Sequence, residues 1–233
     1  MARRNRKQAR NNKMRHLITQ LNPLSPISEQ YRTIRTNIQF SSVDQELKSI
    51  LVTSSGPGEG KSMTTANLAT VYAQQGKRVL LVDADLRKPT VHYTFRLDNL
   101  KGLSNVLIGE EGLENVINRS HVENLFVISS GPIPPNPSEL LGSKKMNAFI
   151  NEATSVFDMI IFDTPPVLAV TDAQLLANYV DGSILVVRSK DTEYEAAIRA
   201  KEALEPAKAK LLGAVLNDRD KKATDYYYYY GDQ

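Results

Sequence analysis

A glycine-rich stretch at residues 55–62, Ser-Gly-Pro-Gly-Glu-Gly-Lys-Ser, is the first part of the sequence that predicts chemistry. It follows a short apolar run and precedes a helical pattern at residues 64–75. Glycines let backbone N–H groups turn around phosphate oxygens, and the N-terminus of the next helix adds roughly half a positive charge. In such a loop Lys61 can bridge the β- and γ-phosphates while the Ser62 hydroxyl ligates Mg²⁺. The stretch therefore predicts binding of a nucleoside triphosphate with Mg²⁺, although Ser55 replaces the usual first glycine.

Three aspartates stand where apolar runs end. Asp83 and Asp85 follow one run directly, and Asp163 follows another. Residues two apart in extended backbone share a side, and the carboxyl ends of parallel strands border the ligand crevice. We expect Asp83 and Asp85 to hold Mg²⁺ or take a proton, and Asp163 to be an outer metal ligand. The alternative is that these acids only cap loops, but buried unpaired acids are costly unless a cation neutralises them.

The elements that must position these groups alternate along the chain. Six short apolar runs read as strands buried on both faces, at residues 49–53, 79–82, 125–128, 159–162, 184–187 and 211–216. Helical patterns lie between them, for example at residues 64–75 and 197–204. This alternation predicts an α/β fold, a doubly wound and mostly parallel sheet covered by helices on both faces, within residues 25–217. The proline-containing loop at residues 131–137 has no identifiable chemistry.

The N-terminal region divides into a basic arm, residues 1–24, and a helix, residues 25–41. Seven of the first 16 residues are Lys or Arg and none is acidic; taking these seven from the net charge of +3 leaves −4 for the remainder. The arm either touches anionic lipid, at about 1 kcal/mol per basic residue, or is a solvated flexible end. Ser25 and Pro26 signal the helix start. The 4, 3, 4 spacing of an apolar stripe predicts that the helix docks on the body, and the stripe consists of Ile27, Tyr31, Ile34 and Ile38.

Composition excludes several classes of protein. No apolar run approaches the roughly 20 residues of a membrane-spanning helix, and no signal-peptide core follows the arm. Cysteine is absent, which excludes disulfides and thiolate sites. Because the net positive charge comes from the first 16 residues and the remainder is net negative, a nucleic-acid-binding domain is disfavoured. We expect a soluble, cytoplasmic protein without a nucleic-acid partner.

The C-terminal segment, residues 218–233, has no apolar period and reads as a disordered tail. It carries five consecutive tyrosines: Tyr226, Tyr227, Tyr228, Tyr229 and Tyr230. By themselves these tyrosines indicate a disordered aromatic end that is prone to nonspecific contacts. In a chain that also has a phosphate site, they become candidate phosphoacceptors. Nine residues separate Asn217 from Tyr226, up to about 30 Å of extended chain, so the tail can reach its own crevice or a neighbour's.

Together these features resemble the bacterial tyrosine kinases, cytoplasmic P-loop kinases of capsule and exopolysaccharide synthesis. The resemblance covers nearly the whole chain and includes Walker A at residues 56–62, Walker A′ at residues 83–85, Walker B at Asp163 and the terminal tyrosines. It implies autophosphorylation from ATP, with Asp83, Lys61 and Asp85 catalytic and the choice of base between the two acids open. The implied metal ligands are Ser62, Asp85 and Asp163. The implied nucleotide contacts are Gly56, Pro57, Gly58, Glu59, Gly60, Lys61, Ser62, Met63 and Asn217, the last being equally a turn residue.

The resemblance also implies partners. Glu29, Arg32 and Arg35 match the family's Glu-x-x-Arg-x-x-Arg helix, which forms subunit contacts in a homo-oligomeric ring; the alternative is an intrahelical Glu29–Arg32 pair. In members of this type from Gram-positive bacteria a separate membrane-anchored activator docks its cytoplasmic tail on the kinase. A chain of this kind is expected to be cytoplasmic, recruited to the inner face of the membrane, and to meet protein-tyrosine substrates and a phosphatase.

Two other functions fit part of the pattern. A partition or division-site ATPase switch has a related fold but carries a signature lysine five residues before the loop lysine, where this sequence has Gly56. A non-catalytic ATP-binding scaffold is disfavoured by the intact Lys61 and the three aspartates. No motif for guanine is visible, so ATP is favoured over GTP.

Overall fold

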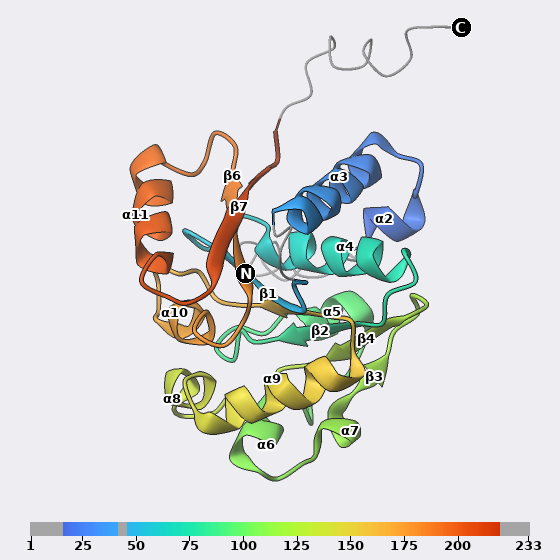
Figure 1. Cartoon of the computed structure of the whole chain (residues 1–233), viewed down its shortest axis with the longest axis vertical. Helices are drawn as coiled ribbons and strands as arrows, with labels where there is room; N and C mark the ends of the chain where they lie inside the picture. The colour runs from blue at the N-terminus through green and yellow to red at the C-terminus, as the bar shows by residue number, and fades with distance from the viewer. Residues whose placement is uncertain (1–15, 42–45, 220–233) are drawn as a thin grey trace, which may run out of the picture.

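The computed structural model describes residues 16–41 and 46–219. Its centre is a seven-stranded sheet in the order β3-β4-β2-β5-β1-β6-β7, whose outermost strands β7 and β3 lie far apart in Figure 1. The strands are β1 (Ser49–Ser54), β2 (Val79–Asp83), β3 (Asn118–Arg119), β4 (Leu125–Ile128), β5 (Met159–Asp163), β6 (Gly182–Arg188) and β7 (Lys210–Asn217). All neighbouring pairs are parallel except β3 with β4. The predicted mostly parallel, doubly wound sheet is confirmed.

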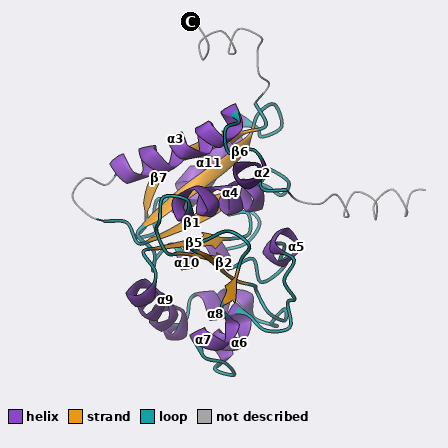
Figure 2. Ribbon diagram, turned by 90° about the vertical axis from the view of Figure 1, so that its right-hand side faces the viewer, coloured by secondary structure: helices purple, strands orange, loops and turns teal. Residues whose placement is uncertain are grey.

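Helices cover both faces of the sheet. They are α2 (Ile18–Leu21), α3 (Pro26–Phe40), α4 (Lys61–Ala73), α5 (Val91–Phe95), α6 (Leu103–Ile108), α7 (Leu113–Val116), α8 (Pro137–Leu141), α9 (Lys144–Val156), α10 (Asp172–Leu176) and α11 (Tyr194–Leu204). One buried cluster joins the sheet to α4 and α5, a second joins it to α6, α9 and α10, and a third, smaller one joins β6 to α11. Figure 2 shows α3 and α4 on one side of the strands and α8 and α9 on the other.

The strand order explains why the predicted acids meet. Strand β1 lies between β5 and β6, and β5 lies between β1 and β2. Asp83 at the end of β2 is paired in register with Asp163 at the end of β5. The loop that leaves β1 therefore opens beside both acids, at the carboxyl edge where open α/β sheets bind their ligands.

The N-terminal helix forms as its sequence predicts, with two differences. Ser25 caps α3, accepting a 3.1 Å hydrogen bond from Ser28 N, and Pro26 occupies its first turn. Ile38 is buried and Tyr31 and Ile34 pack against the core, but Ile27, the first residue of the predicted stripe, is 39% exposed. The short helix α2 was not predicted: Leu17 is buried within the expected arm, so the packed body begins before residue 25.

Strand β7 differs from the inner strands. The sequence predicts burial on both faces, yet β7 is mostly exposed or half-buried because it is the edge of the sheet. Its pairing with β6 skips Leu212, and Gly213 follows with φ of 154°. This extra residue forms a β-bulge. The short antiparallel strand β3 at the opposite edge was also not predicted. Within the part of the chain that the structure describes, no helix is long and apolar enough to cross a membrane.

Candidate active site

The phosphate loop connects β1 to α4, and its shape depends on two glycines. Gly58 and Gly60 have φ values of 87° and 92°, a region that disfavours any residue with a Cβ. Ser55 is not among the described residues with positive φ, so a serine is tolerated at this position. Gly56 is half-buried and Pro57 is exposed. Because α4 begins directly after Gly60, the free N–H groups of its first turn lie at the loop.

Lys61 lies between two buried carboxylates. Its Nζ atom is 3.2 Å from Asp85 Oδ2, 3.3 Å from Asp163 Oδ1 and 3.3 Å from Ser62 Oγ. Burial alone would lower the pKa of Lys61, but the charges of Asp163, Asp85 and Asp83 raise it above its usual value. The ammonium group therefore stays charged and neutralises the acids that the sheet brings together.

Asp83 is fully buried and is oriented by backbone groups. Its Oδ2 atom accepts hydrogen bonds from Thr90 N at 3.0 Å and Val91 N at 2.9 Å, where α5 begins. Burial, reinforced by the negative charge of Asp163, raises the pKa of Asp83 to about 7. Such a carboxylate accepts a proton far more readily than an ordinary aspartate near pKa 4.

The oxygen atoms around Lys61 suit Mg²⁺. Asp163 Oδ2 is buried and has no hydrogen-bond partner among the described residues, while burial raises the pKa of this carboxyl group against the opposing charge of Lys61. Ser62, Asp85 and Asp163 offer the hard oxygen ligands that Mg²⁺ prefers. Across residues 16–41 and 46–219, no group of three or more His, Cys, Asp or Glu side chains is arranged to hold a metal. Since Mg²⁺ in proteins is usually bound by one or two carboxylates plus substrate phosphates, these residues would hold it together with a nucleotide.

The loop is held in place by two residues expected to contact nucleotide. The Glu59 carboxylate accepts hydrogen bonds from Ser55 N at 2.9 Å and from Thr192 Oγ1 at 2.8 Å. Asn217 Nδ2 donates to the backbone oxygen of Glu59 at 2.9 Å. Met63, in the first turn of α4, packs against the core on that face. Both polar side chains thus fix the loop, and contact between Asn217 and an adenine stays a prediction.

Comparison with known proteins gives the family. A family model described as an AAA domain matches residues 47–197. Tyrosine-protein kinase YwqD of Bacillus subtilis is 56% identical over 217 residues, 93% of this chain and 92% of that protein. The chain belongs to the bacterial tyrosine kinases. Two solved structures agree, each with a TM-score of 0.85: the chimerical protein CapA2B2, at 45% identity over 88% of this chain and 90% of that one, and the kinase domain of the Escherichia coli tyrosine kinase ETK, at 35% identity over 90% and 82%.

In this bacterial tyrosine kinase, the segment after Asp85 is anchored by a pair that the sequence did not predict. Arg87 Nε lies 2.9 Å from Asp172 Oδ2 and Arg87 Nη2 lies 3.0 Å from Asp172 Oδ1, although 85 residues separate them in the chain. Asp172 is fully buried, and Ser138 Oγ donates to it at 2.8 Å. No spacing rule predicts this contact. It joins the Asp83–Asp85 segment to α8 and α10.

The predicted oligomer residues are not equivalent in this kinase. Glu29 and Arg32 form an ion pair on the exposed flank of α3. Arg35 instead donates from Nη1 to the Val71 backbone oxygen at 2.7 Å, and so joins α3 to α4 within one chain. Subunit contacts by these three residues stay a prediction, and Arg35 differs from the other two because its side chain is already bound to the neighbouring helix. The five tyrosines of the tail lie outside the described residues.

Proposed function

We propose that this kinase transfers the γ-phosphoryl group of Mg²⁺-bound ATP to tyrosine hydroxyl groups, including those of its own cluster, Tyr226–Tyr230. The supporting observation is the position of Lys61. Its ammonium lies within 3.3 Å of both Asp85 and Asp163 at the phosphate loop, with Asp83 buried beside them. The site thus holds one lysine and three carboxylates, so its net charge is suited to a further cation. That cation would also balance the negative charge that the phosphates bring.

In the proposed reaction the tyrosine oxygen forms a bond to the γ-phosphorus, and the bond between that phosphorus and the β,γ-bridging oxygen breaks to release ADP. The phenolic proton passes to the carboxylate of Asp83. Lys61 offsets charge on the transferring group. Since phosphoryl transfer has a loose transition state in most analyses, positioning and neutralisation supply most of the rate enhancement and the base receives a late proton.

Mg²⁺, held by Ser62, Asp85 and Asp163 together with the nucleotide, would supply charge neutralisation of the phosphates. Asp85 is already engaged by Lys61, while Asp83 makes no contact with a cation within 4 Å among the described residues. This difference supports Asp83 as the base and Asp85 as a ligand. Both carboxylates nevertheless occupy the same short segment, so substitutions must separate their roles.

The tail is proposed to be phosphorylated by a neighbouring subunit in a ring. Glu29 and Arg32, on the exposed flank of α3, are proposed to contact that neighbour. Each phosphate adds about −1.5 to −2 charge, so several on one tail would repel adjacent tails and loosen the ring. A phosphatase would reverse the modification. A membrane-anchored activator is proposed to recruit the kinase through its cytoplasmic tail, in the regulation of capsule or exopolysaccharide synthesis.

The test is incubation of the full chain with [γ-³²P]ATP and Mg²⁺, with and without the activator tail, followed by phosphotyrosine mapping. Label is expected on residues 226–230. Lys61→Met should lower transfer at least about 100-fold, the size of effect seen when a charge-stabilising group is removed. Asp83→Asn should lower transfer while retaining nucleotide binding, and Asp98→Asn, at an exposed aspartate, should change neither. Label recovered only as free phosphate would instead support an ATPase switch.

The ring is tested by light scattering. Exchanging Glu29→Arg together with Arg32→Glu keeps the pair within α3 but alters a surface that must match a neighbour, so the ring should dissociate. Arg35→Lys serves as the comparison, because it changes a contact to Val71 inside the chain. With all five tail tyrosines changed to Phe, ATP should no longer loosen the ring; equal dissociation of this variant and the unchanged chain would contradict the proposed role of the tail.

A further inference from the structure

The proline-containing loop at residues 131–137, for which the sequence suggests no chemistry, begins beside Asp83. Val82 of β2 and Ile128 of β4 are paired in register, so Asp83 and Ser129, which follow them, are neighbours at the carboxyl edge of the sheet. The loop starts two residues after Ser129 and contains four prolines and no charged side chain. Because proline fixes φ, such a loop is stiff. A rigid, uncharged segment therefore borders the acid that receives the phenolic proton in the proposed reaction.

The first end of this loop is held by a second loop, residues 96–102. Asn99 Nδ2 donates to the Gly131 backbone oxygen at 2.8 Å, and Gly131 N donates to Asn99 Oδ1 at 3.0 Å. The two backbones approach closely at Gly102, where an added Cβ would lie 2.0 Å from the Ser129 backbone oxygen. The two loops therefore form one continuous surface.

The far end of the loop is fixed to the catalytic segment. Ser138 Oγ accepts a hydrogen bond from Arg87 Nη2 at 2.8 Å and donates one to Asp172 Oδ1 at 2.8 Å. Arg87 comes two residues after Asp85 in the chain. Since both ends of the loop are held, a substrate that binds to it does not have to order it first, which lowers the cost of binding.

Apolar side chains on this surface are exposed. Leu100, in the loop at residues 96–102, is 77% exposed, and Ile133, in the proline-containing loop, is 63% exposed. Pro132 and Pro135 are exposed beside Ile133. Exposed apolar patches that lie together mark surfaces where a ligand or partner binds. These four side chains are called the proline platform below: Leu100, Pro132, Ile133 and Pro135.

The direction of phosphoryl transfer indicates what binds to the proline platform. The phosphate loop follows β1 and the platform follows β4, and β2, which ends at Asp83, lies between these strands in the sheet. In phosphoryl transfer the attacking and leaving oxygens lie roughly in line with the phosphorus. Because the leaving oxygen belongs to the nucleotide at the phosphate loop, the tyrosine must approach Asp83 from the opposite side, which is the side of the platform.

We propose that the proline platform binds the residue next to the reacting tyrosine and selects an aromatic or large apolar side chain there. The proline rings and the side chains of Leu100 and Ile133 supply apolar surface against which an aromatic ring can pack. The tyrosine run at residues 226–230 meets this requirement, because every tyrosine in it has an aromatic neighbour. The proposal rests on the proposed phosphoryl transfer and adds the surface that selects the acceptor.

The experiment measures the binding of two fluorescein-labelled peptides to the full chain, with Mg²⁺ and ADP present, by fluorescence anisotropy. Both peptides span residues 223–233 and keep Tyr228 as the single acceptor. The other four tyrosines are phenylalanine in one peptide and serine in the other, and these positions are Tyr226, Tyr227, Tyr229 and Tyr230. The phenylalanine peptide should bind roughly tenfold more tightly, because it buries apolar surface that the serine peptide lacks.

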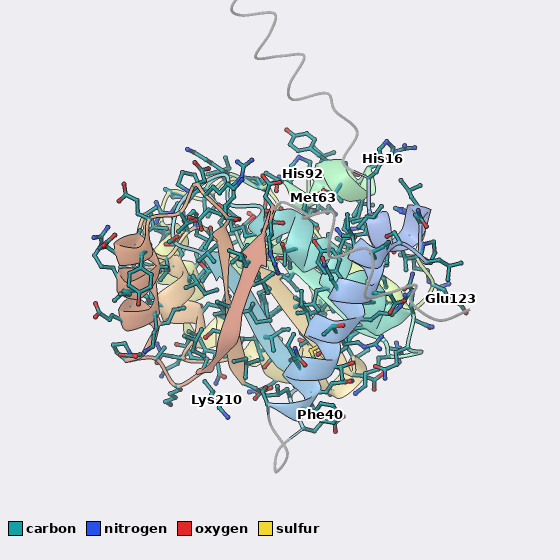
Figure 3. The ribbon with its side chains drawn as sticks, turned by 90° about the horizontal axis from the view of Figure 1, so that it is seen from above. His16, Phe40, Met63, His92, Glu123 and Lys210 are labelled. Carbon is teal, nitrogen blue, oxygen red and sulfur yellow. The ribbon has the colours of Figure 1, made fainter. Side chains whose placement is uncertain are left out.

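A double variant assigns this preference to the platform. Leu100→Ser with Ile133→Ser should weaken binding of the phenylalanine peptide by roughly tenfold and leave binding of the serine peptide unchanged. A general structural defect would instead weaken both peptides alike. Phe40→Ser is the matched control, because Phe40 is 72% exposed but lies on the opposite side of the molecule from His92 of α5, as Figure 3 shows. This control should leave both affinities unchanged.

Steady-state phosphorylation of the same peptides gives a second readout. In the double variant the KM for the phenylalanine peptide should rise roughly tenfold, while the KM for ATP stays the same because the platform lies apart from the phosphate loop. Equal affinity of the unchanged chain for both peptides, a preference retained by the double variant, or an equal loss for Phe40→Ser would overturn the proposal. These results would leave the proposed phosphoryl transfer intact. Selective binding of the phenylalanine peptide without transfer to it would support the platform and contradict the phosphoryl transfer.

Discussion

The side-chain amide of Asn217 donates a 2.9 Å hydrogen bond to the backbone oxygen of Glu59, so the last residue of β7 contacts the phosphate loop directly. The contact is close: a Cβ added to Gly60 would lie 2.0 Å from Asn217 Nδ2. The tail that carries the tyrosines starts one residue later. The loop that binds phosphate and the root of the proposed acceptor segment are therefore neighbours.

Asn217→Ala should weaken ATP binding by roughly two- to tenfold, because a hydrogen bond of about 0.5 to 1.5 kcal/mol that orders the phosphate loop is lost. Isothermal titration calorimetry measures the change. Asn178→Ala is a suitable control, since the Asn178 amide donates to backbone oxygens of its own turn, Gln174 O and Leu175 O. Identical affinities for Asn217→Ala and the unchanged chain would show that the contact does not order the loop.

Gly60→Ala should abolish nucleotide binding, because it adds a clash with Asn217 to the strain of a φ of 92°. Gly76→Ala separates these two causes: its φ is 87°, yet nothing lies within 4 Å of the added Cβ. It should cost about 1 kcal/mol of stability and leave ATP affinity unchanged. In the double variant Gly60→Ala with Asn217→Ala, stability measured by urea unfolding should recover in part. No recovery would mean that strain alone accounts for the defect.

The Asp83→Asn variant should alter the pH dependence of stability. The pKa of Asp83 is about 7 in the folded protein, against about 3.9 in an unfolded chain. Between these values the unfolded state loses the proton first, so this residue destabilises the fold as pH rises from 4 to 7, and the cost stays constant above 7. Without nucleotide or Mg²⁺, Asp83→Asn should therefore raise the free energy of unfolding, measured by urea unfolding, more at pH 8 than at pH 5, and the extra gain at the higher pH should be on the order of 1 to 3 kcal/mol. The same gain at both pH values would contradict the raised pKa.

Removing Arg87 should destabilise the fold, because Asp172 would remain as a fully buried carboxylate that accepts a hydrogen bond from Ser138 but has lost its ion pair. Arg87→Ala is expected to lower the free energy of unfolding by about 3 to 5 kcal/mol. Arg87→Ala with Asp172→Ala removes both charges and should restore much of that loss. Urea unfolding of the single and double variants gives the coupling energy between the two side chains. If the losses in free energy of unfolding simply add, Arg87 and Asp172 do not stabilise each other.

The sequence predicted the centre of this site well because its signals are local. A loop of glycines, a lysine after it and an acid at each strand end follow from backbone geometry, and the parallel sheet brings strand ends together. Contacts made by long side chains could not be predicted in this way. The 3- and 4-residue spacing places Arg35 on a flank of α3, but spacing alone cannot predict that its guanidinium reaches Val71 on α4. Arg87 and Asp172 likewise meet only because α10 packs against α8 and β1.

Burial was predicted less well where it depends on strand order. Residues 211–216 are as apolar as the inner strands, and composition alone cannot distinguish an edge from a centre. Helix α2 has four residues, which are too few to show a helical spacing of apolar residues. It forms because Leu17 and Thr19 are buried against α4. The sequence therefore predicted an arm that extends to residue 24, whereas the structure shows that Leu17 and α2 belong to the packed body.

The bulge at Leu212 and Gly213 protects the β7 edge of the sheet against aggregation at high protein concentration. An outermost strand with unpaired backbone groups is a template on which another molecule can extend the sheet and start aggregation. The extra residue breaks the regular repeat that such templating needs, and Lys210 places a charge at the start of the same strand. At high protein concentration this kinase should therefore resist aggregation through pairing of its β7 edge with the sheet of another molecule.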